Sequence, residues 1–193
     1  MDFYNRQHLK APETISLIGC GGGCWVAIFG AMMGVKRINL FDSDILEGHN
    51  LNRLPYSPEM VGKKKTLALK QLIQTLRPDC EVSCFDKVEK MNIGMLEGKV
   101  FIAVDNLDDR QDIDEYCKER NLERIHMTFE KDSLYLSNIL PKEFENAISI
   151  RRGYNEPTTQ VVTTASIVGA LALASMSGQD IKVHLNDGGE III

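Results

Sequence analysis

The sequence predicts an α/β fold, a three-layer sandwich whose sheet is mainly parallel in its N-terminal part and continues into an antiparallel C-terminal extension. Three observations favour this fold. Short apolar runs alternate with helical segments along residues 1–130, which is the rhythm of consecutive βαβ units. A glycine-rich turn joins the first apolar run to the first helix. Within residues 131–193, apolar runs are separated by short turns, so their pairing must be antiparallel.

The first βαβ unit is the clearest part of the pattern. Residues 14–19 form a short apolar run that ends in glycine, as a buried strand does, and residues 25–33 follow as an apolar helix closed by Gly34. Residues 36–42 alternate apolar and polar side chains and end at a carboxylate, which predicts a second strand. These elements together have about the length of one βαβ unit, roughly thirty residues.

The remaining elements of this half are less regular. Residues 43–58 are rich in Asp, Asn, Gly and Pro, and they predict a long loop of the kind that is often functional. Residues 59–76 place Met60 and three leucines, Leu67 and Leu76 among them, between lysines, which predicts an amphipathic helix. Further strands are predicted at residues 80–86, 100–104 and 123–129, a weak helix at 88–96 and a polar helix at 108–120.

The C-terminal extension is predicted from its short connections. Residues 134–140 are predicted as a strand that follows the preceding strand after only a turn, so the two must be antiparallel. Residues 141–157 are irregular, and residues 158–177 predict an apolar, alanine-rich helix. Residues 181–185 and 190–193 flank Asn-Asp-Gly-Gly, which is a strong hairpin signal.

Composition limits the classes of partner. The chain has 193 residues, of which 44% are hydrophobic and 25% charged, so it has enough apolar side chains for a packed core. Its net charge of −5 gives no bulk attraction to DNA or to an anionic membrane surface. The first ten residues lack the apolar stretch of a signal peptide, and the odd count of five cysteines predicts reduced thiols. We therefore expect a cytoplasmic protein.

The glycine-rich turn is the first candidate for a binding site. Gly19-Cys-Gly-Gly-Gly-Cys24 lies between a strand and a helix, where glycines let backbone N–H groups approach a phosphate. The third glycine, which usually packs the helix on the strand, would fall at Cys24, and cysteine is small enough to be tolerated there. Asp42 ends the next strand roughly 20 residues further on, where a carboxylate can bind ribose hydroxyls. The alternative is a glycine-rich turn that binds no ligand.

Three polar segments follow the carboxyl ends of predicted parallel strands, where open α/β sheets bind ligands. They are Asn-Leu-Asn-Arg at 50–53, Gly-Lys-Lys-Lys at 62–65 and Asp-Asn-Leu-Asp-Asp-Arg at 105–110. An arginine, a lysine and an acidic residue around a helix N-terminus fit a triphosphate with Mg²⁺, whereas a dinucleotide carries only a pyrophosphate. The lysines could instead be the polar start of a helix, although lysine at that end opposes the helix dipole.

These segments belong to an ordered set of motifs that resembles the ThiF/MoeB family, the adenylating enzymes related to ubiquitin-activating enzymes. The resemblance covers residues 4–110 and, more weakly, the helix at 161–176. Each motif alone is weak, but the order and spacing of the set are specific. The motifs are Tyr4-Asn-Arg-Gln7, Gly19-x-Gly-Gly-x-Cys24, Asp42-x-Asp44, Asn50-Leu-Asn-Arg53, Val61-Gly-x-x-Lys65 and Val104-Asp-Asn106.

The resemblance implies that residues 1–193 form a single Rossmann-like adenylation domain that binds ATP and Mg²⁺, with its nucleotide-binding half in residues 1–130. Asp42 would bind the ribose and Asp105 the Mg²⁺, while Arg6 would reach the ATP of a neighbouring subunit, which implies a homodimer. The implied catalytic residues are Arg6, Arg53, Lys65 and Asp105. The implied cofactor-binding residues are Gly19, Gly21, Gly22, Asp42, Asp44, Asn50, Arg53, Lys65 and Asn106.

The implied reaction is attack by a C-terminal carboxylate on the α-phosphate of ATP, which yields an acyl-adenylate and pyrophosphate. The carboxylate would belong to a ubiquitin-like or sulfur-carrier protein that ends in Gly-Gly, or to a peptide. This step needs charge neutralisation and positioning but no side-chain nucleophile. The chain departs from the family pattern at Cys24 and Leu54, has no paired Cys-x-x-Cys motifs, and has no cysteine in residues 141–157 for a covalent second step.

Two other functions remain open on the sequence alone. The missing cysteine is compatible with a nucleotide-binding or inactive scaffold subunit of a ThiF-like heteromer. The glycine turn is compatible with a Rossmann oxidoreductase that uses NAD, although no acid–base pair for hydride transfer accompanies it. A zinc site is disfavoured, because the pairs Cys20/Cys24 and Cys80/Cys84 lack the two-residue gap of structural sites.

Overall fold

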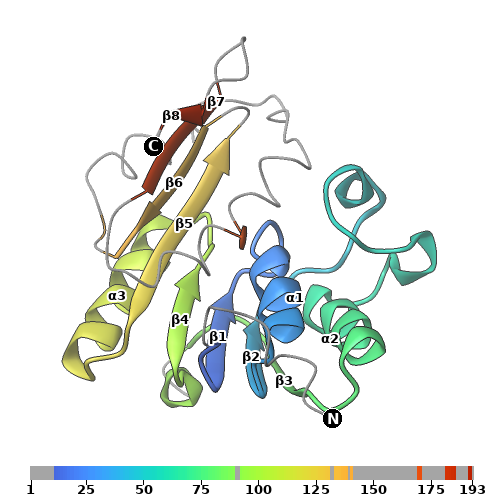
Figure 1. The fold of residues 1–193 in the computed structure, drawn as a ribbon, viewed down its shortest axis with the longest axis horizontal. Helices are drawn as coiled ribbons and strands as arrows, with labels where there is room; N and C mark the ends of the chain where they lie inside the picture. Colours follow the sequence, from blue (N-terminus) through green and yellow to red (C-terminus); the bar gives the residue numbers. More distant parts are fainter. Residues whose placement is uncertain are drawn as a thin grey trace.

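The computed structural model describes residues 11–89, 92–130, 133–138, 140, 169–170, 181–185 and 191–192. The strands in these residues are β1 (Thr14–Ile18), β2 (Arg37–Phe41), β3 (Glu81–Phe85), β4 (Lys99–Ile102), β5 (Arg124–Glu130), β6 (Ser133–Ser137), β7 (Ile181–Leu185) and β8 (Ile191–Ile192). They form one sheet in the order β3-β2-β1-β4-β5-β6-β7-β8 (Figure 1). Pairing is parallel from β3 to β5 and antiparallel from β5 to β8. The predicted mainly parallel sheet with an antiparallel C-terminal extension is therefore confirmed.

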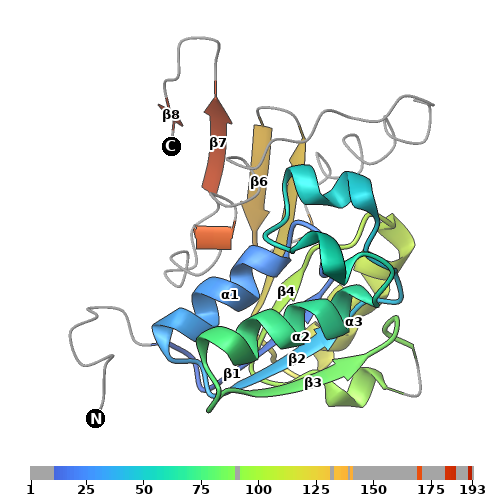
Figure 2. The ribbon, with the colours of Figure 1, turned by 90° about the vertical axis from the view of Figure 1, so that its right-hand side faces the viewer.

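Within the described residues, three long helices cover the two faces of the parallel part. α1 (Cys24–Met33) and α2 (Lys65–Leu76) lie side by side on one face, and α3 (Leu107–Glu119) lies on the other (Figures 1 and 2). One apolar cluster joins the sheet to α1 and α2, and a second joins Ile18 and Phe41 of the sheet to α3. The three-layer sandwich expected from the sequence is thus confirmed.

β1 shows how the sequence produces this arrangement. All five of its residues are buried, because β1 pairs with β2 on one side and β4 on the other and is covered on both faces. A strand in that position has no solvent-facing side, so even its polar residues Thr14 and Ser16 are buried. Ser16, a buried polar residue, is satisfied by two hydrogen bonds with the backbone of Glu97.

α1 ends where the sequence predicts it. Gly34 adopts a φ of 106°, a left-handed conformation that favours glycine, and its N–H donates to the carbonyls of Gly30 and Ala31. Residues 169–170 are helical, and a Cβ on Gly169 would lie 2.5 Å from the Cβ of Trp25, so the two backbones approach closely. The rest of the predicted helix at 158–177, residues 141–157, and the N-terminal motif with Arg6 lie outside the described residues.

The start of α2 needs correction. The helix predicted from residue 59 begins at Lys65 instead. Gly62 adopts a φ of 90°, which breaks a right-handed helix, and the chain then pairs with the preceding loop through an antiparallel bridge between Ile45 and Lys64. These tertiary hydrogen bonds replace the first helical turns that the pattern of residues suggested.

The apolar face of α2 also differs from the prediction. The side chains of Leu67 and Leu76 are exposed, at 51% and 46% relative accessibility. The helix packs on α1 and the sheet through a stripe at i, i+3 and i+7. The buried residues of α2 are Thr66, Ala68, Leu69 and Ile73.

The irregular segments hold short turns of 3₁₀ helix. Within the predicted loop 43–58 lies η1 (Gly48–Asn52), followed by η2 (Pro58–Met60). The weak helix predicted at residues 88–96 is wrong for the part that is described, where only η3 (Ile93–Met95) is helical. No helix in the described ranges is both long and apolar enough to cross a bilayer.

A buried carboxylate ties α3 to β5. The Asp114 side chain is 5% exposed and accepts from Arg124, from Nε2 of His126 at 2.9 Å, and from Nζ of Lys118 at 2.6 Å. Burial alone would raise the pKa of Asp114, but these hydrogen bonds outweigh it and hold the pKa well below its usual range. Burial lowers the pKa of His126, so the neutral imidazole donates to Asp114.

We expect Asp114→Asn to lower the free energy of unfolding by about 3 kcal/mol at pH 7, because it leaves the partly buried guanidinium of Arg124 without its counter-charge. The folded-state pKa of Asp114 is depressed, so its contribution is present above the ordinary value near 3.9 and is lost only as pH falls through the lower folded value. Urea unfolding at pH 7 and at pH 8 should therefore show the same difference from the wild type. Asp112→Asn, at an exposed position of the same helix, serves as the control. An equal effect in both variants would contradict the role of Asp114.

Candidate functional site

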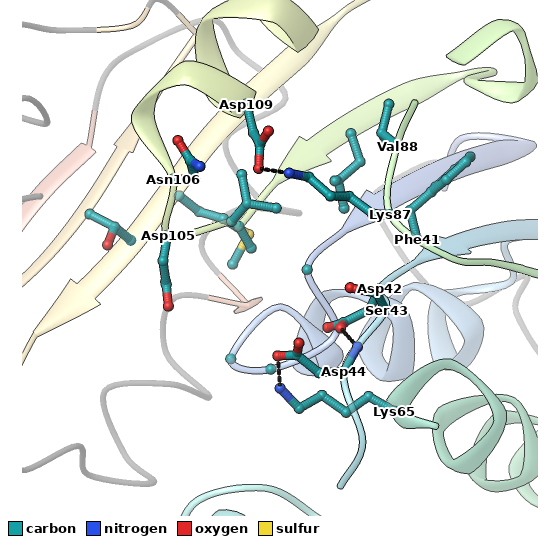
Figure 3. A pocket seen from close by; sticks show the side chains of 18 of the residues that line it. Phe41, Asp42, Ser43, Asp44, Lys65, Lys87, Val88, Asp105, Asn106 and Asp109 are labelled. Carbon is teal, nitrogen blue, oxygen red and sulfur yellow. Dashed lines mark hydrogen bonds and ion pairs between the residues drawn. The ribbon is translucent and has the colours of Figure 1, made fainter. Parts of the chain in front are cut away.

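A cavity of about 350 Å³ lies at the carboxyl ends of the parallel strands. In the strand order, β1 lies between β2 and β4, so the chain switches direction across the sheet at β1, and crevices at such switch points bind ligands in open α/β sheets. The sticks in Figure 3 show how side chains from four separate segments converge there. All ten candidate residues within the described ranges line it: Gly19, Gly21, Gly22, Asp42, Asp44, Asn50, Arg53, Lys65, Asp105 and Asn106.

The glycines of the turn differ in what a larger side chain at each position would contact. Gly19 adopts a φ of 94°, and a Cβ there would lie 2.7 Å from the carbonyl oxygen of Ala103. A Cβ on Gly23 would lie 2.3 Å from the carbonyl oxygen of Gly19, so Gly23 is what lets α1 pack against the strand. The packing role that the motif suggested for Cys24 therefore belongs to Gly23. Nothing lies within 4 Å of a Cβ on Gly21, which leaves the cavity open at that point.

The N-terminus of α1 faces this turn and carries no negative charge of its own. Gly23 is the N-cap, no side chain caps the helix, and its first turn contains no acidic residue. The partial positive charge of the helix end is therefore available to an anion in the cavity. A phosphate bound there would accept hydrogen bonds from backbone N–H groups at the helix end, which no side chain caps.

Asp42 connects the glycine turn to the end of β2. Its Oδ2 accepts from the backbone N of Cys20 at 2.7 Å, and its Oδ1 accepts from the backbone N of Asp44 at 2.8 Å. Burial raises the pKa of Asp42, while the N–H of Asp44 and the charge of Lys65 partly offset this. A carboxylate has lone pairs left after two such bonds, so Asp42 can also accept from hydroxyl groups in the cavity.

Lys65 is held in the cavity by Asp44. Its Nζ lies 2.7 Å from Oδ2 of Asp44, and its backbone N donates to the carbonyl of Asp44 at 2.9 Å. The Lys65 side chain is 13% exposed, whereas that of Asp44 is 65% exposed. The structure thus pairs two residues that the sequence assigned separately to the cofactor, and an incoming phosphate would compete with Asp44 for the ammonium group.

Arg53 enters from the 3₁₀ helix η1, whose geometry Asn50 fixes. Oδ1 of Asn50 accepts from the backbone N of Glu47 at 3.0 Å in a reciprocal capping arrangement. Nη1 of Arg53 donates to the carbonyl of His49 at 3.1 Å. Burial lowers the pKa of Arg53, and the charge of Asp105 acts in the opposite direction, so the arginine and this carboxylate lie within electrostatic reach. Arg53 remains a cation at neutral pH.

Asp105 and Asn106 follow β4. Oδ1 of Asn106 accepts from the backbone N of Asp108 at 2.9 Å, so this side chain caps α3. Asp105 is exposed at the cavity. No cluster of three or more metal-ligating side chains occurs among the described residues. A lone carboxylate fits Mg²⁺ in a nucleotide site, because this ion takes one or two carboxylates and completes its shell with phosphates and water.

Comparison with known proteins decides the family. The ThiF family model matches residues 5–181 of the chain. The chain belongs to the ThiF family. Ubiquitin-like modifier-activating enzyme 5 of Dictyostelium discoideum is 32% identical over 132 residues, which cover 60% of this chain and 34% of the relative. The enzyme of the same name from Caenorhabditis elegans is 29% identical over 137 residues, which cover 63% and 33%. The chain thus spans about a third of the length of these relatives.

Solved structures share the fold of this ThiF-family chain. Escherichia coli MccB with ATP superposes with a TM-score of 0.77 at 19% identity, over 95% of this chain and 63% of that one. A structure of PaaA gives a TM-score of 0.75 at 17% identity, over 93% and 71%. The Rossmann-like architecture expected from the motifs is confirmed by these similarities.

The described cysteines of this ThiF-family chain are not poised for covalent chemistry. Cys20 and Cys24 lie beside the glycine turn but are fully buried, and burial raises the pKa of both thiols. The side-chain carboxylate of Asp42 raises the pKa of Cys20 further. Both therefore stay protonated at neutral pH and act as small core residues.

Sequence reasoning missed three residues around the cavity of this ThiF-family chain. Arg110 is buried and donates to the carbonyls of Ile102 and Met127, at 3.0 and 2.8 Å, so it ties the end of β4 to the middle of β5. Lys87 and Asp109 form an ion pair at 2.8 Å on the cavity wall. The Asp-Asn-Leu-Asp-Asp-Arg motif contained two of the three, but no spacing rule shows which side chain of a polar helix turns inward.

Proposed function

We propose that this chain is an ATP-dependent adenylating module that activates the C-terminal carboxylate of a protein or peptide. The observation that supports this most is the cavity itself. It combines a glycine turn at an open helix N-terminus with the cations Arg53 and Lys65 and with the carboxylate Asp105. That donor set suits three phosphates and Mg²⁺ and includes no side chain prepared to act as a nucleophile.

Different residues bind different parts of the nucleotide in this proposal. The glycine turn receives a phosphate at the N-terminus of α1, and Asp42 accepts from the ribose hydroxyls. Arg53, Lys65 and Asn50 engage the remaining phosphates. Asp105 would hold Mg²⁺, which when bound neutralises charge on the phosphates. The side-chain oxygen of Asn106 accepts from the backbone N of Asp108 in the helix cap, so Asn106 contributes to the cofactor through the position of Asp105.

The chemistry needs no proton transfer at the start. A carboxylate oxygen of the substrate forms a bond to the α-phosphorus while the bond from that phosphorus to the bridging oxygen of pyrophosphate breaks, and pyrophosphate leaves with the electron pair. The carboxylate is ionised at neutral pH, so the protein has only to align it and to stabilise the charge that moves onto pyrophosphate. We assign the second task to Lys65 and Arg53, two cations that line the cavity.

The carboxylate substrate is proposed from the family and the named relatives. One relative is called a ubiquitin-like modifier-activating enzyme, and one structural neighbour is the microcin C7 biosynthetic enzyme MccB in complex with N-formylated MccA. A ubiquitin-like or sulfur-carrier protein ending in Gly-Gly, or a peptide, is therefore the proposed partner. The proposal includes a cytoplasmic homodimer in which Arg6 completes the site of the neighbouring subunit.

The test is ATP–pyrophosphate exchange with the full chain. Exchange should occur when ATP, Mg²⁺ and a Gly-Gly-ended candidate protein encoded near the gene are present together, and it should stop when the candidate lacks its last glycine. Absence of exchange with every such candidate, together with calorimetry that detects no ATP binding, would favour the scaffold subunit instead. Binding of NAD but not ATP would favour the oxidoreductase.

The in-trans role of Arg6 predicts complementation between two inactive variants. In a mixed dimer of Arg6→Ala and Asp105→Ala, the subunit that keeps Asp105 receives an intact Arg6 from its partner. Mixing equal amounts should restore roughly a quarter of the wild-type exchange rate, because half of the dimers are mixed and each has one intact site. Failure to recover any activity, with dimers verified by ultracentrifugation, would remove the in-trans role while leaving adenylation untouched.

A further inference from the structure

An ion pair crosses one end of the cavity. Nζ of Lys87 lies 2.8 Å from Oδ2 of Asp109, and both residues line the cavity. Lys87 follows β3, which is the edge strand, whereas Asp109 is in the first turn of α3. Figure 3 shows the two side chains pointing toward each other, at the opposite end of the cavity from Lys65 and Asp44. The pair therefore spans the carboxyl ends of β2 and β1.

Neighbouring contacts keep Lys87 in this position. Asp86, the residue before it, forms its own ion pair with Lys64 at the start of α2. The two pairs together run from α2 on one face of the sheet to α3 on the other. An isolated exposed pair contributes only about 0–1 kcal/mol to stability, so the interest of this one is its location rather than its strength.

The charges along the cavity show which part of a nucleotide reaches the pair. The glycine turn, Arg53 and Lys65 supply the positive charge of the cavity. Figure 3 shows Asp42 between Lys65 and the apolar side chains of Phe41 and Val88. Flat aromatic bases bind between apolar side chains, so the base lies at the far end, next to Lys87 and Asp109. The apolar residues there are Ile18, Phe41, Val88 and Val104.

A second cavity of about 480 Å³ lies on the other side of the pair. It extends along α3 past Tyr116, and η3 forms part of its lining where a longer helix was predicted between β3 and β4. The two cavities share the residues that separate them. These are Ile18, Lys87, Val88, Val104 and Asp109.

We propose that the Lys87–Asp109 ion pair is the end wall of the nucleotide site and limits it to a nucleotide whose base carries no bulky substituent. This inference rests on the proposed nucleotide-binding function. An adenine nucleotide joins its ribose through N9, so with the ribose at Asp42 the amino group on C6 points away from the ribose and toward the wall. A substituent on that amino group meets the ion pair, whereas without the pair it extends into the second cavity.

The inference predicts a change in ligand selectivity. Calorimetry with Mg²⁺ would compare ATP and N6-benzyl-ATP on the wild type, on the double variant Lys87→Ala/Asp109→Ala, and on Asp108→Ala. We expect the wild type to bind N6-benzyl-ATP at least about tenfold more weakly than ATP, and the double variant to bind the two within about threefold. Asp108 is the matched control, because it is an exposed aspartate beside Asp109 that lines neither cavity, and its variant should keep the wild-type ratio.

The possible results separate this inference from the function on which it rests. A wild type that binds both nucleotides equally, or a double variant that keeps the wild-type ratio, overturns the end wall and leaves the adenylating function in place. A wild type that binds no nucleotide overturns both. Melting curves of the double variant and of Asp108→Ala verify that each is folded before the ratios are compared. The single variant Asp109→Asn, which removes the charge but keeps the shape, should show an intermediate ratio.

Discussion

Replacing Lys65 by alanine should lower the rate of adenylate formation by about 10²–10³, the loss that follows removal of one preorganised group that stabilises developing charge. The Lys65 side chain is only 13% exposed, so little water competes for its ammonium group. Single-turnover measurement of adenylate, with ATP and substrate both saturating, reports the chemical step and separates it from ATP binding.

Lys63→Ala is the matched control for this prediction. Lys63 is two residues earlier, exposed, and hydrogen-bonded to Gln71 rather than directed into the cavity. Its variant should keep the wild-type rate, because the run of three lysines contributes one side chain to the cavity and not a diffuse positive charge. If both variants lose rate equally, Lys65 acts only through long-range electrostatics. If neither loses rate, Lys65 has no part in the reaction.

Gly23→Ala should lower the free energy of unfolding by at least about 3 kcal/mol, the upper range for overpacking a close contact. The backbone of Gly23 is right-handed helical, so alanine is not strained by its own torsion angles. The cost is steric, because the new methyl group would lie 2.3 Å from the carbonyl oxygen of Gly19 and 2.8 Å from Cδ1 of Leu17. Chemical denaturation of the chain without ligand measures this loss.

Gly21→Ala provides the contrasting result. Its methyl group meets nothing within 4 Å and would point into open space. The free energy of unfolding should therefore change by no more than about 0.5 kcal/mol. Because Gly21 lines the cavity, the same methyl group should weaken ATP binding. A variant at position 21 that unfolds as readily as the one at position 23 would contradict the separate roles of these two glycines.

Sequence patterns were sufficient where local and tertiary preferences agree. The buried run of β1, the helix closed by Gly34 and the hairpin of β7 and β8 all appear where they were predicted. The start of α2 was wrong because the hydrogen bonds that end the preceding loop are tertiary, and the bridge between Ile45 and Lys64 leaves no periodic signal in the sequence. The weak helix predicted at residues 88–96 was wrong in its described part because only local propensity supported it.

The candidate site was predicted residue by residue, but the relations between its members were not. The motifs identify Asp44 and Lys65, yet nothing in their spacing shows that the two are paired. Asn106 belongs to a motif and also caps α3, so one side chain serves two purposes that a pattern cannot separate. Lys87 and Asp109 were given no role from the sequence. They meet only in the folded sheet, where β2 and β1 lie between β3 and β4.

The pairing of Lys65 with Asp44 has a consequence for the entropy of ligand binding. A free lysine side chain loses about 1.5–2 kcal/mol of rotational entropy when a ligand immobilises it. Here Asp44 has already immobilised it, so that loss belongs to folding and would not recur each time a phosphate ligand binds. When phosphate takes over the ammonium group, the displaced carboxylate is the more exposed partner and returns to water at little cost. Binding is then an exchange of anions on a stationary cation.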